Sequence, residues 1–185
     1  MNIIQLRYLS FFFGIISLLS FFNIIYSYYL NLYLNLDTYY YCLFISLIIS
    51  LIFYKIKTPD KKLNIYHKIL TVFFGYISLP LILSIPYYLS IYNLTFLNSF
   101  FEAVSGFTST GFTIFENIKH IDQSLILWRS SIQWIGGLYF LFSIIFLIDI
   151  YDENFKKTLT NFISFDTSEL LNEKKLVNVF LKLSS

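Results

Sequence analysis

The sequence predicts an all-α membrane protein, with four transmembrane helices and one re-entrant helix and loop between the third and the fourth. Of its 185 residues, 57% are hydrophobic and only 13% are charged, which is too apolar for an ordinary soluble domain. Charge-free runs long enough to cross a bilayer recur along the chain. One of these runs is too long for a single span and leads into small polar residues, SGFTSTGFT at residues 105–113.

The first two spans lie on either side of a polar turn. No charged residue stands between Arg7 and Asp37, and this gap predicts a transmembrane helix from about Tyr8 to Tyr33. A second span is predicted from about Tyr39 to Tyr54. The turn between them is expected at a group of polar residues: Asn31, Asn35, Asp37 and Thr38.

The third apolar run has no charge between Ile69 and Phe101, so it must be divided into two helices. Pro80 and Pro86 lie inside it and are expected to kink or end a helix. The prediction is a helix over Ile65–Tyr92, a turn over residues 92–95, and a short helix over Phe96–Phe107. Thr95 or Asn98 is expected to cap the short helix.

The last span follows a polar connection at residues 116–122 and is predicted from about Ser124 to Ile148. After Asp149 the chain turns polar and ends in an amphipathic tail. These boundaries divide the chain into three parts. They are a helix pair with a basic loop (1–62), a repeat of helix, short helix, loop and helix (63–150), and the tail (151–185).

The distribution of lysine predicts how the chain is oriented in the membrane. The loop after the second span carries five lysines between Lys55 and Lys68, and the tail carries five more between Lys156 and Lys182. The two intervening connections hold only Lys119. By the positive-inside rule both termini are cytoplasmic, and residues 105–113 lie on the external side.

Composition and motifs also exclude several classes of function. The formal net charge of +2 makes nucleic acid an improbable partner. A lone cysteine, Cys42, provides no disulfide framework. His67 and His120 lack the spacing of metal ligands and are interpreted as solvated loop residues. No HExxH, phosphate-binding loop or nucleophile elbow is present, so an enzyme is not expected.

The stretch SGFTSTGFT suits a cation pathway. Irregular backbone at membrane depth occurs only where it is buried in protein or lines water, and there its carbonyl oxygens can replace part of an ion's hydration shell. Glycine permits the dihedral angles that such a loop needs. The carboxyl end of the short helix, near Phe107, adds partial negative charge. The alternative is that these small residues serve ordinary helix contacts.

Two segments carry a family resemblance: LNSFFEAVSGFTSTGFTIFENI, and SLILWRSSIQWIGG after it. Together they resemble the first pore-loop repeat of the Trk/Ktr/HKT superfamily of potassium uptake proteins, closest to the TrkH-type membrane subunit. The residues that match the family pattern are Glu102, Ser105, Gly106, Thr108, Thr110, Gly111, Trp128, Arg129, Gln133, Trp134, Gly136 and Gly137. Ser109 stands where the pattern has a threonine.

The resemblance implies a potassium pore in which four repeats surround one axis. It implies that the backbone carbonyls of residues 109–112, namely Ser109, Thr110, Gly111 and Phe112, lie near the ion, with K⁺ at Thr110 and Gly111. Glycine at position 111 favours potassium over sodium in this family. Glu102, Thr108 and Arg129 are expected to support the filter. No bound cofactor is implied beyond the transported K⁺.

The chain departs from the family in carrying one repeat where members carry four. One repeat supplies a quarter of a filter, so the hypotheses are a fragment, completed by the missing repeats, or a homotetrameric channel. The resemblance also implies a bacterial inner-membrane location, contact with membrane lipid, and a cytoplasmic nucleotide-binding partner of the TrkA type. The alternative function is a non-conducting membrane protein or a regulator of a full-length relative.

Two further features of the last span leave alternatives open. Arg129 either extends to the membrane interface or pairs with Glu102 and braces the short helix. Gly136 and Gly137 either permit close helix packing or form a gating hinge.

Overall fold

The computed structural model describes residues 6–56, 65–115 and 121–148. Within these ranges the backbone is helical apart from turns and short irregular segments, and it contains no strand. The helices are α1 (Leu6–Tyr29), α2 (Leu36–Lys55), α3 (Ile65–Leu83), α4 (Ile85–Tyr88), α5 (Phe96–Phe107) and α6 (Gln123–Ile148). Most of the predicted basic loop, residues 116–120 of the polar connection, and the tail at 151–185 lie outside the described residues.

Four stretches of helix are long and apolar enough to cross a membrane, which confirms the predicted class and number of spans. They cover Leu6–Tyr29, Leu36–Lys55, Tyr66–Tyr88 and Gln123–Leu147. The third stretch combines α3 and α4. The short helix α5 begins and ends at the predicted residues, and Thr95 is its cap, because the Thr95 hydroxyl accepts a hydrogen bond from the Asn98 amide at 3.3 Å.

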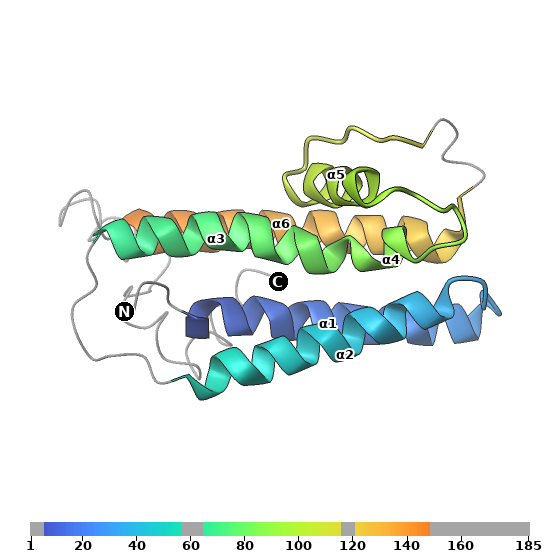
Figure 1. Ribbon diagram of the computed structural model, residues 1–185, viewed down its shortest axis with the longest axis horizontal. Coiled ribbons are helices and arrows are strands. Elements are labelled where there is room, and N and C mark those ends of the chain that lie inside the picture. Colours follow the sequence, from blue (N-terminus) through green and yellow to red (C-terminus); the bar gives the residue numbers. More distant parts are fainter. Residues whose placement is uncertain (1–5, 57–64, 116–120, 149–185) are drawn as a thin grey trace.

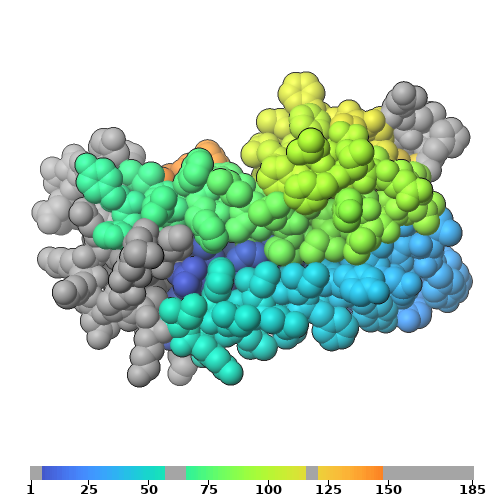
Figure 2. Space-filling view, in the orientation of Figure 1, coloured from blue at the N-terminus to red at the C-terminus, as the bar shows by residue number. Residues whose placement is uncertain are grey.

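α3 and α6 form a central pair, with α1 and α2 on one side of it and α5 on the other, as Figure 1 shows. α1 packs along α2, and α1 also contacts α3 and α6. α5 packs against α6 and α3, on the side of these helices that faces away from α1 and α2. In the space-filling view of Figure 2, α5 and the segment after it project from one edge of the molecule. The short helix and its loop are therefore a surface feature of this chain.

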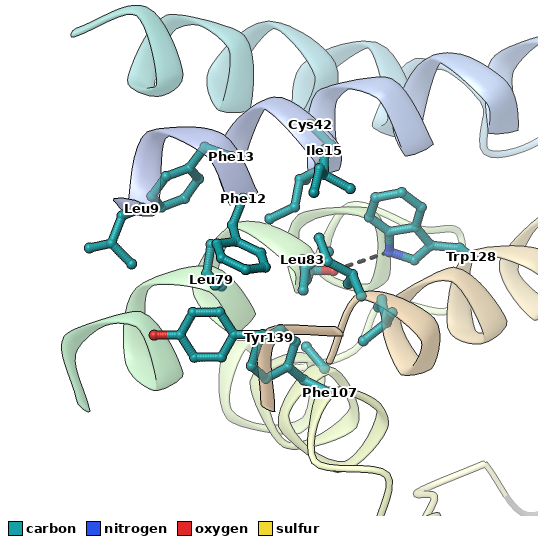
Figure 3. Close-up of a cluster of buried hydrophobic side chains, with 14 of the residues drawn as sticks. Leu9, Phe12, Phe13, Ile15, Cys42, Leu79, Leu83, Phe107, Trp128 and Tyr139 are labelled. Atoms are coloured by element: carbon teal, nitrogen blue, oxygen red, sulfur yellow. Dashed lines mark hydrogen bonds between the residues drawn. The ribbon is translucent and has the colours of Figure 1, made fainter. Parts of the chain in front are cut away.

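The core lies where α1, α3, α5 and α6 meet, and Figure 3 shows part of it. Aromatic side chains dominate this core. Tyr139 of α6 packs edge-on against Phe12 of α1 and against Tyr76 of α3, with ring centroids 4.8 and 5.0 Å apart. Phe107, the last residue of α5, also contacts the Tyr139 ring. Tyr139 therefore joins the short helix to the central bundle.

The turn between α1 and α2 differs from the prediction at both ends. α1 ends at Tyr29, four residues early, because Asn31 adopts the left-handed conformation (φ 56°). The amide of Leu32 then bonds back to the Ser27 carbonyl at 2.8 Å, closing the helix end in a Schellman motif. α2 starts at Leu36, before the predicted Tyr39, so Asp37 and Thr38 lie in its first turn.

The predicted single helix over Ile65–Tyr92 is two helices, because Pro86 interrupts the ladder of backbone hydrogen bonds. Without an amide hydrogen at Pro86, the Ile82 carbonyl has no partner four residues on, and the Cys42 thiol donates to it at 3.6 Å. The next carbonyl, that of Leu83, accepts from the Trp128 indole at 3.1 Å (Figure 3). Pro80, in contrast, lies within α3.

Several buried hydroxyl groups in the spans bond to helix carbonyls. Ser20, Thr71 and Ser143 each donate to the carbonyl four residues earlier in the same helix. Between α1 and α2, Ser10 and Ser50 each donate to the other's carbonyl, at 2.8 and 2.9 Å. These bonds satisfy polar groups where no water is present.

Candidate functional site

The carboxyl end of α5 sets the course of the loop at residues 108–115. Ser109 adopts the left-handed conformation (φ 56°). Its amide donates to the Gly106 carbonyl at 3.0 Å, and the next amide, of Thr110, donates to the Ser105 carbonyl at 3.1 Å. These two bonds form a Schellman motif, the same ending that closes α1. The chain therefore reverses direction directly after the short helix.

Gly111 lies in this loop with φ 79°, a conformation that side chains disfavour. A Cβ atom at this position would meet no other atom within 4 Å. The glycine is therefore needed for the backbone conformation and not for lack of space. The residues from Thr108 to Phe112 are exposed, so this part of the loop lies open on the surface of the chain.

Glu102 lies behind the loop, fully buried within α5. Its carboxylate forms an ion pair with Arg129 of α6, which is the pairing considered from the sequence. It also accepts hydrogen bonds from the Thr113 hydroxyl at 3.1 and 3.2 Å and from the Ile114 amide at 3.1 Å. One buried carboxylate thus joins the short helix, the returning loop and α6.

The Arg129 guanidinium connects the same carboxylate to the loop backbone. Its Nη2 donates to the carbonyl of Phe112 at 3.1 Å and to that of Gly111 at 3.5 Å. Only 22% of the arginine side chain is exposed. A charged group with one buried anionic partner and backbone acceptors is held in one geometry, unlike an arginine that simply extends to the interface.

The hydroxyl groups of the loop are directed back toward α5. Thr108 donates to the Val104 carbonyl at 2.8 Å. Thr110 lies 3.2 Å from both the carbonyl and the hydroxyl of Ser105, while the Ser105 hydroxyl donates to the Phe112 carbonyl at 2.6 Å. The Phe112 carbonyl therefore has two donors within the chain, from Ser105 and Arg129.

Close approach between α5 and α6 depends on Gly136. A Cβ atom there would overlap the backbone carbonyl of Phe107, the last residue of α5. Gly106 allows a similar approach from the other side, since its Cβ would lie 3.0 Å from Ile132. Gly137 has no such neighbour within 4 Å. Of the two adjacent glycines, Gly136 is the one that serves close packing.

A second polar cluster, the Asp122 network, lies at the amino end of α6. Its members come from α1, α2, the segment after α4, and α6 itself: Asn23, Asn35, Tyr39, Tyr92, Asp122 and Ser124. The Asp122 carboxylate accepts from Asn35 Nδ2 at 2.9 Å and from Ser124 Oγ at 2.6 Å. The Asp122 amide donates to the Tyr92 hydroxyl at 2.8 Å.

No pattern in the sequence indicated this network, or the hydrogen bonds that Thr113 and Ser105 make where the loop returns to α5. Asn35 and Asp122 are 87 positions apart, and each stands in a polar turn where a solvated side chain is the ordinary expectation. Thr113 and Ser105 belong to the quoted motif, but their partners depend on how the loop folds back. No cluster of three or more His, Cys, Asp or Glu occurs in the described ranges, and His120 lies outside them.

Comparison with known proteins adds a family to this geometry. The TrkH family model, described as a cation transport protein, matches residues 38–171. An uncharacterized cation transporter of Methanocaldococcus jannaschii is 30% identical over 127 residues, which cover 68% of this chain and 27% of the relative. No solved structure gives a significant match.

Two shorter matches are to potassium uptake proteins. The Trk system potassium uptake protein TrkI of Halomonas elongata is 41% identical over 64 residues, 35% of this chain and 12% of the relative. The Trk system potassium uptake protein TrkG of Escherichia coli is 41% identical over 46 residues, 25% of this chain and 10% of the relative. The chain thus matches about a quarter or less of the length of these relatives.

Proposed function

Because this chain belongs to the TrkH family of cation transport proteins, we propose that it forms part of a potassium-conducting pore and contributes one strand of its selectivity filter. TrkH proteins are transporters and not enzymes, and four apolar helices make this a multi-pass membrane protein. The observation that carries the proposal is the exposed loop at Gly111, held from behind by the buried Glu102–Arg129 pair.

In this proposal α5 is a re-entrant pore helix. Its 12 residues measure about 18 Å, too short to cross a hydrocarbon core of about 30 Å. The Schellman motif at Ser109 turns the chain back toward the side from which α5 entered. Irregular backbone at this depth is stable where it lines water, and the exposed face of residues 108–112 would supply that lining.

The carbonyls of Ser109, Thr110 and Gly111 are the proposed ligands, with K⁺ bound at Thr110 and Gly111. Phe112 remains a predicted ligand, although its carbonyl already accepts bonds from Ser105 and Arg129. Glu102, Thr108 and Arg129 are the proposed support. The support acts by fixing the positions of oxygens that must replace an ion's hydration shell.

One strand cannot surround an ion, so the ring is completed either by further pore-loop repeats or by other copies of this chain. The exposed loop face suits either neighbour. A cytoplasmic nucleotide-binding subunit of the TrkA type is the proposed regulatory partner, and the bacterial inner membrane, with both termini cytoplasmic, is the proposed location.

Potassium uptake in a bacterial strain without its own uptake systems tests the function. Where other copies complete the ring, the chain is expected to support growth at low K⁺, and Gly111→Ala to reduce K⁺ uptake at equal amounts of protein in the membrane. Growth equal to that of the empty vector, with the protein assembled as a tetramer in the membrane, would favour the non-conducting alternative. Crosslinking in detergent identifies the assembly, because a strict monomer excludes the homotetramer.

A further inference from the structure

We infer that the α1–α2 helix pair holds the 108–115 loop in position through the Asp122 network, with Asn35 and Asp122 as its positioning residues. The inference rests on the proposed function for the role of the loop as a filter strand, whereas the hydrogen bonds of the network are independent of that role. α1 and α2 lie on the side of the bundle away from α5, so the helix pair needs an intermediate to influence the loop.

The first step joins α2 to α6 and to the segment after α4. Asn35, at the amino end of α2, is buried and uses both ends of its amide. Its Nδ2 donates to Asp122 Oδ2 at 2.9 Å, and its Oδ1 accepts from the Ile91 amide at 3.2 Å. Tyr39 of α2 adds a bond of 2.9 Å to the Ser124 hydroxyl. Three separate segments of chain are fixed at this point.

The second step leads from Asp122 to Arg129. Asp122 immediately precedes α6, and its Oδ1 lies 3.4 Å from the Ser124 amide, a contact of the kind that caps a helix. Arg129 stands on the same helix about two turns further on. A helix transmits a shift of its first turn along its length, and the Arg129 guanidinium binds the carbonyls of Gly111 and Phe112.

The third step reaches the other end of the loop through Tyr92. The Tyr92 hydroxyl accepts from the Asp122 amide at 2.8 Å. Its ring packs edge-on against Phe115, with centroids 5.9 Å apart, and Phe115 is the last described residue of the loop. The network therefore supports the loop both through α6 and through its exit.

A nitroxide label at position 112 reports how firmly the loop is held, through its electron paramagnetic resonance spectrum, and this measurement does not require transport. The lines of the spectrum are broad when the label is immobilised and narrow when it moves freely. The Phe112 side chain is 70% exposed, and the hydrogen bonds from Ser105 and Arg129 go to its backbone carbonyl, so Phe112→Cys keeps these bonds in place. Cys42 is fully buried and does not compete for the reagent. The unsubstituted chain, treated in the same way, gives the background.

Asn35→Asp is the main variant, introduced into the labelled chain in detergent. This variant places the new carboxylate at position 35 against that of Asp122, with no hydrogen-bond donor between them. The loop is expected to lose its support, and the spectrum of the label is expected to narrow because the label becomes more mobile. The exchange Asn35→Asp with Asp122→Asn restores a donor opposite an acceptor and is expected to restore the broad spectrum. Tyr92→Phe, which removes one bond and keeps the ring, is expected to narrow the spectrum less.

Ser50→Ala is the matched control, because it removes a hydrogen bond between α1 and α2 near the carboxyl end of α2, whereas Asn35 lies at the amino end. It is expected to lower thermal stability and leave the label spectrum unchanged. The inference is overturned if Asn35→Asp and Tyr92→Phe both give the parent spectrum, or if Ser50→Ala narrows it equally. Absence of K⁺ uptake by the unsubstituted chain would instead count against the proposed function alone, since the label reports on the loop in either case.

Discussion

Glu102 is the residue at which the short helix, the loop and α6 are connected. Glu102→Gln removes the negative charge but keeps the size of the side chain, leaving the Arg129 guanidinium without its buried partner. Breaking a buried pair on one side costs about 3–5 kcal/mol. The variant is therefore expected to unfold at a clearly lower temperature in detergent, and to lose uptake if the proposed function holds.

Asp37→Asn is the control for this prediction. It removes a carboxylate from the first turn of α2, where the side chain is exposed. Its effect is limited to a weaker interaction with the helix dipole. Equal melting temperatures for Glu102→Gln and Asp37→Asn would contradict the buried-pair interpretation.

Gly111 allows backbone conformation to be separated from crowding. Gly111→Ala adds a methyl group that meets no atom within 4 Å at a φ of 79°, so the whole cost is backbone strain of about 1–2 kcal/mol. Gly137→Ala is the matched change, since it is also uncrowded but lies within a helix. Thermal unfolding is expected to show a loss for the first and none for the second; a loss for both would indicate crowding.

The sequence raised the Glu102–Arg129 pair as one of two alternatives for Arg129, and it gave no indication of the other contacts of Glu102. Glu102 and Arg129 are charges beside apolar runs, and the cost of an unpaired charge favours a partner. Thr113 and Ser105 gave no such signal, because a hydroxyl can be satisfied by any nearby carbonyl. The two donors at the Phe112 carbonyl could be found only from the folded loop.

The contact between α5 and α6 predicts the effect of filling Gly136. A methyl group there would overlap the Phe107 carbonyl, and a backbone atom cannot move aside as a side chain does. Gly136→Ala is expected to push α6 away from α5 at a cost of about 1–3 kcal/mol or more. The free energy of unfolding in mixed detergent, compared with that of Gly137→Ala, measures the difference. Equal free energies of unfolding for the two variants would contradict the close-packing role of Gly136 and favour the gating hinge.

The helices that could be predicted well are those with a local signal at each end. α5 has Thr95 before it and glycine and hydroxyl residues at its end, and both of its predicted ends were correct. The end of α1 was wrong by four residues, because Tyr33 continues the apolar run while Asn31 has already reversed the chain. Apolar composition marks a span, whereas the helix end depends on a single left-handed residue.

For the whole molecule, the testable expectation is its orientation. Leu34→Cys, in the α1–α2 turn, is expected to react with a membrane-impermeant maleimide in intact cells. Lys55→Cys, at the other end of α2, is expected to react only after the cells are permeabilised. Both positions are exposed and lie on the same helix or next to it, so each serves as the other's control. The reverse pattern would invert the proposed topology.

The family and the number of spans followed from the sequence, while the joining of distant segments did not. Two motifs at a fixed separation were sufficient to indicate the family, and the charge-free runs around them were sufficient to give the number of spans. The Asp122 network depends on Asn35, Tyr39 and Asp122 meeting at one end of the bundle. Single polar residues in turns gave no indication of which others they would meet.

The placement of α5 opposite the α1–α2 pair has a consequence for adaptation to different bilayers. The outer side of α2 carries exposed apolar residues such as Phe44, Ile48 and Ile52, and none of them belongs to the loop or to the Asp122 network. The length of the apolar stretch on this side can therefore change with the thickness of the surrounding lipid while the loop keeps its geometry. Fit to the host membrane and the geometry of the loop can thus evolve along separate lines in this chain.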